Sequence, residues 1–78
     1  MKVFVSLYTI LKRYGKDKIG EDGSIEIADG STNRDLSAIL GIPPKPAQVY
    51  LVNQLSRKAD YVLEESDSVK ILSFIGGG

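Results

Sequence analysis

The chain ends in SVKILSFIGGG, residues 68–78, where an apolar run passes directly into three glycines. Apolar residues alternate along this run, which predicts a β-strand over residues 68–74. Alternation divides the strand into two sets, one on each face: Val69, Ile71 and Ser73, and Lys70, Leu72 and Phe74. We expect the first set to face the core and the second to face a partner, with a sheet that the fold covers on both faces as the alternative.

The glycine tail, Gly76, Gly77 and Gly78, presents the terminal carboxylate on a thin segment of chain. Glycine lacks a Cβ and adopts nearly any backbone angles, so such a segment fits a channel too narrow for side chains. Three successive glycines at one end are a rare accident at the ordinary glycine frequency of about 7%. The tail therefore predicts a C-terminus that is itself a reactant, with a frayed end or a linker remnant as the alternative.

Four further strands are predicted upstream, over residues 2–8, 24–28, 48–53 and 55–57. Each combines alternating or β-branched apolar residues with flanking turn residues. The first two strands form a hairpin with a long polar connection, and Asn53-Gln54 is the expected turn between the last two. Asn53 is therefore more readily a turn former than a contact residue.

One helix is predicted between the second and third of these strands. Thr32 and Asp35 have the spacing of a capping box, and Gly41 suits the left-handed position after a helix end. Leu36, Ile39 and Leu40 are spaced as a single apolar stripe. The order strand, strand, helix, strand, short strand, strand predicts a helix across one face of a small mixed sheet. The first and last strands are expected to be parallel and central.

Composition excludes several classes of function. The 78 residues suffice for one domain, and ten basic residues balance ten acidic ones, so no bulk charge attracts nucleic acid or an anionic membrane. The chain has no histidine and no cysteine, so catalysis or metal binding of its own is not expected. Without a long apolar stretch, a cytoplasmic location is expected.

Charge is unevenly distributed along the chain. Residues 1–18 hold five cations and one carboxylate, a net charge of +4, and residues 59–68 hold four carboxylates, a net charge of −4. Two solvated faces are the simplest interpretation, and a surface that steers a partner is the alternative.

The order of elements and the free glycine end resemble the MoaD/ThiS family of ubiquitin-like (β-grasp) sulfur carrier proteins. The resemblance covers the whole chain and is sharpest at its end, where an acidic turn residue, Asp67, precedes the alternating strand and the glycines. Val52-Asn53 is similar to the pair that ends the third strand in that family. The resemblance implies an α+β fold, a β-grasp domain over residues 1–75 and a flexible tail over residues 76–78. Its mixed sheet has four or five strands with one main helix across one face.

What the resemblance implies for function is a carrier rather than an enzyme, although such a chain could act as the small subunit of a synthase. An E1-like adenylating enzyme would use ATP to activate Gly78, and a sulfur donor would convert it to a thiocarboxylate. A sulfur-accepting synthase would then use the sulfur in cofactor biosynthesis, with molybdopterin slightly favoured over thiamine. In this interpretation the chain binds no cofactor or metal, Gly76 and Gly77 thread into the partner enzymes, and Leu72, Phe74 and Ile75 dock on their rims.

Two alternatives remain open at the level of sequence. The first is a ubiquitin-like protein modifier that is conjugated to lysine through Gly78, because the activation chemistry is the same. The second is a β-grasp binding module without C-terminal chemistry, which the zero net charge and the glycine tail make less favourable.

Overall fold

The computed structural model describes residues 1–8, 11, 13–15, 17–43 and 48–73. Five strands and one helix are formed within this part of the chain, in the predicted order. Their bounds are β1 (Lys2–Leu7), β2 (Ser24–Glu26), α1 (Asn33–Ile39), β3 (Gln48–Val52), β4 (Leu55–Arg57) and β5 (Ser68–Ser73). Strand β4 has the predicted bounds, and β1, β2 and β3 end one or two residues earlier than predicted. Strand β5 has the predicted start, and its last predicted residue, Phe74, lies outside the described residues.

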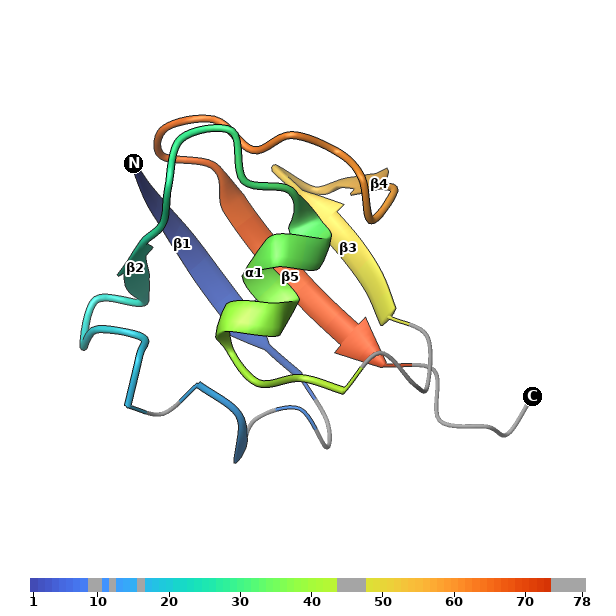
Figure 1. Ribbon diagram of the computed structural model, residues 1–78. Coiled ribbons are helices and arrows are strands. Elements are labelled where there is room, and N and C mark those ends of the chain that lie inside the picture. The colour runs from blue at the N-terminus through green and yellow to red at the C-terminus, as the bar shows by residue number, and fades with distance from the viewer. Residues whose placement is uncertain (9–10, 12, 16, 44–47, 74–78) are drawn as a thin grey trace.

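The strands form one mixed sheet in the order β2-β1-β5-β3-β4. β5 lies at its centre, parallel to β1 and antiparallel to β3, and the other neighbouring pairs are antiparallel. Helix α1 lies across one face of this sheet (Figure 1). The predicted central, parallel pairing of the first and last strands is therefore confirmed, and so is the predicted first hairpin.

The core lies between α1 and the sheet, and apolar residues at alternating strand positions form its sheet side. Val3 and Val5 from β1, Val52 from β3, and Val69 and Ile71 from β5 are at most 7% exposed. Their alternation means that each of these strands turns its other side chains to the face away from the helix. The predicted division of β5 into two faces is confirmed for residues 69–72.

The buried stripe of α1 differs from the predicted one. Leu36 and Leu40 are buried as expected, but Ile39 is 36% exposed, and Asn33 and Ser37 are buried instead. At 3.6 residues per turn, the buried positions 33, 36, 37 and 40 share one side of the helix, and position 39 lies beyond Leu36 on the side away from position 37. Two buried polar residues thus occupy helix positions that the apolar pattern alone could not identify.

The ends of α1 follow the sequence prediction. The Thr32 hydroxyl accepts a hydrogen bond from the backbone N–H of Asp35, and the Asp35 carboxylate accepts one from the N–H of Thr32. After the helix, Gly41 adopts a φ of 78°, which favours glycine. The N–H groups of Gly41 and Ile42 then bond the carbonyls of Ala38 and Ser37, as in a Schellman motif.

Asn53 and Asp67 connect the end of β3 to the start of β5. Asn53 donates a side-chain hydrogen bond to Asp67 over 2.9 Å and accepts one from the N–H of Ser68 over 3.1 Å. The second Asp67 oxygen accepts a hydrogen bond from the N–H of Glu64 over 2.8 Å. Asn53 and Gln54 also have the two positive φ angles of the tight β3–β4 turn, 51° and 71°. Asn53 is thus a turn former, as predicted, and it also fixes the strand that precedes the tail.

Candidate functional site

The candidate site begins where β5, the central strand, ends. Ser73 is its last residue and pairs with Gln48, the first residue of β3. Strand β5 is paired on both sides up to Ile71, which lies opposite Leu7 of β1, and its pairing with β3 continues to Ser73, five residues before Gly78. Phe74, Ile75, Gly76, Gly77 and Gly78 lie outside the described residues, so their predicted threading, docking and reactive roles stay predictions.

The face of the sheet away from α1 presents apolar side chains along the length of β5. The outer-face patch consists of half-buried apolar side chains from three adjacent strands: Phe4 in β1, Val49 and Leu51 in β3, and Leu72 in β5. The pairing register places Val49 opposite Leu72, and Leu51 opposite Lys70. Leu72 therefore lies on the face predicted from the sequence. Its role in docking a partner stays a prediction.

No helix formed by the described residues covers this patch, because α1 lies on the opposite face. The middle of the patch is polar: Ser6 in β1 lies opposite Lys70, which in turn lies opposite Leu51. Apolar side chains around Lys70 form a surface that suits a partner with both apolar and acidic groups.

Several charged side chains of the basic run, residues 1–18, and the acidic run, residues 59–68, make hydrogen bonds within the fold. Asp67 is buried in its hydrogen bonds to Asn53 and Glu64, and Glu65 accepts a hydrogen bond from the backbone N–H of Lys2 over 3.2 Å. On the basic side, Lys18 donates to the carbonyl of Ile39 over 2.8 Å. Part of each charged run is therefore used in structural hydrogen bonds, and the predicted solvated face does not hold for Asp67, which is buried.

Two groups with shifted pKa values lie elsewhere, on the β2 side of the sheet. The carboxylate of Asp29 raises the pKa of the Met1 amine through a hydrogen bond, with Glu26 also nearby. The Ser24 hydroxyl and N–H both donate to Asp22 and lower the pKa of its carboxyl group. Both shifts come from local turn and terminus contacts and indicate no acid–base pair.

Among the described residues, no group of histidine, cysteine, aspartate or glutamate side chains is arranged to hold a metal ion. In the same part of the chain, no helix has both the length and the apolar character needed to cross a bilayer.

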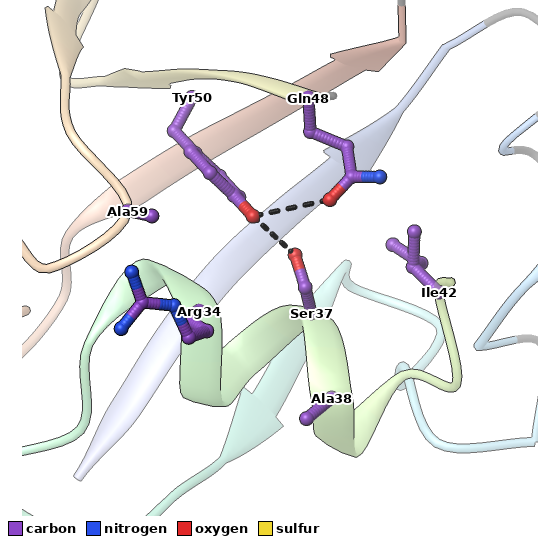
Figure 2. Close-up of a pocket in the computed structure, with 7 residues that line it drawn as sticks. All are labelled: Arg34, Ser37, Ala38, Ile42, Gln48, Tyr50 and Ala59. Atoms are coloured by element: carbon purple, nitrogen blue, oxygen red, sulfur yellow. Dashed lines mark hydrogen bonds between the residues drawn. The ribbon is translucent and has the colours of Figure 1, made fainter. Parts of the chain in front are cut away.

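A pocket between α1 and β3 was not predicted from the sequence. Its lining comes from the helix, from β3 and from the two loops beside them: Arg34, Ser37, Ala38, Ile42, Gln48, Tyr50 and Ala59 (Figure 2). The Ser37 and Tyr50 hydroxyls lie 2.9 Å apart within it. The one feature of the sequence that could have pointed to this pocket is Ser37, a polar residue one turn before Gly41 in a helix with few apolar residues.

Comparisons with known proteins identify the fold. No protein-family model matches the sequence, and no curated protein matches it. The crystal structure of SAMP1 from Haloferax volcanii resembles this structure with a TM-score of 0.66 and 15% sequence identity, over 100% of both chains. At this identity the likeness concerns the fold. The chain therefore has the ubiquitin-like β-grasp fold, with a five-stranded mixed sheet and one helix, as predicted.

Proposed function

We propose that this chain is a ubiquitin-like carrier protein whose terminal carboxylate, on Gly78, is activated and converted to a thiocarboxylate. The observation that carries the proposal is the position of β5: the central strand of a β-grasp sheet passes within two residues into three glycines. A terminal carboxylate that reacts inside an enzyme needs a rigid strand to position it and a narrow segment without side chains to reach the active site. The central strand and the three glycines have these properties. The likeness to SAMP1, a ubiquitin-like protein, supports the same general kind of function.

The chemistry belongs to partner enzymes. A carboxylate is a poor electrophile, so an E1-like enzyme would let the Gly78 carboxylate attack the α-phosphorus of ATP, forming an acyl adenylate and releasing pyrophosphate. Sulfur from a donor would then attack the carbonyl carbon and AMP would leave. The resulting thiocarboxylate would pass its sulfur to a synthase, with molybdopterin as our first choice of pathway over thiamine, because the segment after β1 is long.

The outer-face patch supplies binding energy for this role. Ordering the three glycines in a channel costs about 1–2 kcal/mol per residue. Complete burial of one leucine or phenylalanine side chain contributes about 1.5–3 kcal/mol, and half-buried side chains contribute less. Phe4, Val49, Leu51 and Leu72 together would offset most of the ordering cost, and Phe74 and Ile75 would add to it.

The test is the intact mass of the chain after incubation with ATP, an E1-like activating enzyme and a sulfur source. We expect a mass increase that corresponds to exchange of one oxygen for one sulfur, located on Gly78 by fragmentation. A chain with one residue appended after Gly78 should show no change while its melting temperature stays the same. An unchanged mass for the natural chain with an enzyme that adenylates it would contradict sulfur transfer.

Conjugation to protein lysines through Gly78 is the second candidate. The likeness to SAMP1 favours it, because that protein is a ubiquitin-like small archaeal modifier. Isopeptide-linked adducts on lysine, found after the same activation, would support this candidate.

A further inference from the structure

The pocket between α1 and β3 has about 430 Å³ of accessible volume, within the range of ligand-binding sites. It lies on the helix side of the sheet and shares no residue with the outer-face patch. In Figure 2, Arg34 and Ala59 border one side and Ile42 and Gln48 the other, with the hydroxyls of Ser37 and Tyr50 between them. The pocket is open on one side, so a molecule bound in it stays exposed to solvent there unless a larger partner covers that side.

The polar groups inside the pocket already satisfy one another. Tyr50 donates its one hydroxyl proton to the Gln48 side-chain oxygen over 3.2 Å, so the Ser37 hydroxyl donates to Tyr50. Gln48 in turn donates to the carbonyl of Pro43 over 2.8 Å. Because these donors are committed, the inner part of the pocket favours an apolar occupant, which would contact Ala38 and Ile42.

The edge of the pocket has the opposite preference. Arg34 is exposed, and no carboxylate in the described part of the chain pairs with its guanidinium. The neighbouring carboxylate, Asp35, is held in the capping box by the N–H of Thr32 over 3.0 Å. A guanidinium beside an apolar pocket is a site for a carboxylate on an apolar body.

We propose that this pocket docks an acidic–aliphatic segment of a partner protein. An aliphatic side chain of that segment fills the apolar part over Ala38 and Ile42, and a glutamate or aspartate beside it pairs with Arg34. The surface of the partner covers the open side, which a free small molecule would leave in solvent.

The place of the pocket favours a partner that also holds the C-terminus. Gln48, which lines the pocket, pairs with Ser73, the last residue of β5. An enzyme that encloses Gly78 therefore approaches this edge of the domain. The choice of that enzyme as the partner rests on the proposed function, whereas the chemistry of the pocket does not.

The test is a titration of the full chain, followed by NMR, with two acetylated and amidated tripeptides, Leu-Glu-Leu and Leu-Gln-Leu. We expect the glutamate peptide to shift the backbone amides of Ser37, Ala38 and Ala59 saturably. Its affinity should exceed that of the glutamine peptide about fivefold, the value of one exposed ion pair. Arg34→Gln should remove this difference, and Arg13→Gln, an equal change of charge outside the pocket, should leave it intact.

Three results would overturn the proposal: equal affinities for the two peptides, shifts confined to Phe4, Leu51 and Leu72, or an unchanged preference in Arg34→Gln. A chain with an amidated C-terminus separates this proposal from the proposed function, because it blocks activation and leaves the pocket unchanged. Retained preference in that chain supports the pocket on its own. If amidation alone shifts the amides of the pocket, the chain's own end is the occupant and the proposal fails.

Discussion

Asn53 and Asp67 show how two side chains position the strand that carries the tail. Asp67 uses one oxygen for Asn53 and the other for the N–H of Glu64, and it is only 6% exposed. Such a buried carboxylate is costly unless its hydrogen bonds are made. The pair therefore fixes the β3–β4 turn against the start of β5.

Asn53→Gly should lower the free energy of unfolding by about 1–3 kcal/mol, because it leaves the buried Asp67 carboxylate short of a donor. Because glycine readily adopts the φ of 51° at this position, the loss of unfolding free energy measures the contribution of the Asn53 side chain alone. Urea denaturation measures the effect. Asp67→Ala combined with Asn53→Gly should cost less than the sum of the two single changes, since both remove the same hydrogen bond.

Gln54→Gly is the matched control, because Gln54 occupies the next position of the same turn with a φ of 71°. Its replacement by glycine should be neutral or stabilising, because it relieves an unfavourable backbone angle. An equal loss for both glycine variants would mean that turn entropy, not the bond to Asp67, controls stability here.

At the scale of elements, α1 has seven residues, and a helix this short depends on its ends and its packing. The sequence predicted the ends well, because Thr32, Asp35 and Gly41 act through local backbone geometry. It predicted the buried face less well: Ser37 is buried because Tyr50 supplies a hydroxyl partner from another element. A partner thirteen positions away in sequence leaves no mark on helical periodicity.

Thr32→Ala should destabilise the domain by about 1 kcal/mol, because the Asp35 N–H loses the side-chain acceptor that caps the helix. Thr32→Ser keeps the hydroxyl and should restore most of the stability. Thermal unfolding of the three chains measures both effects. If serine and alanine are equally destabilising, the lost methyl group, rather than the cap, accounts for the change.

Leu72→Ser should weaken docking with little effect on the fold, because Leu72 is half-buried on the outer face while its neighbour Ile71 is fully buried. We expect the KM for adenylation of Gly78 to rise severalfold with kcat nearly unchanged, since uniform binding energy is lost. Steady-state adenylation assays measure this.

Leu55→Ser makes the same chemical change at a position of β4 that is 58% exposed. It should leave the KM unaltered. A rise in KM of the same size for this control would mean that the outer-face patch is not the surface that docks on the activating enzyme.

At the scale of the whole molecule, the sequence predicted the order of elements and the parallel central pair. Strand alternation and turn residues are local signals, and a short chain offers few ways to combine them. The pocket and the outer-face patch are different, because each gathers side chains from separate elements. Arg34 and Tyr50, or Val49 and Leu72, become neighbours only after the fold and the register are set.

The N-terminus is held at the β2 side of the sheet by contacts with the end of β2 and the residues that follow it. The Met1 amine donates to the carbonyl of Ile27 over 2.7 Å and lies 3.2 Å from the Asp29 carboxylate. The hydrogen bond to Asp29 is the main cause of the raised pKa of this amine. The first residue of the chain is thus fixed by charge as well as by the pairing of β1 with β2 and β5.

Stability should therefore fall as the pH rises above the ordinary value of this amine, 8.0. Because folding raises the pKa, the charged amine contributes its full stabilisation below the unfolded value and loses it as pH passes through the folded value. Urea midpoints measured from neutral pH to about pH 9, where ordinary lysine and tyrosine side chains are still mostly protonated, should show this decline. Asp29→Asn removes the main cause of the shift, so its midpoints should vary less over the same range. A decline of equal slope in both chains would assign the effect to other groups and leave the terminal ion pair without a role in stability.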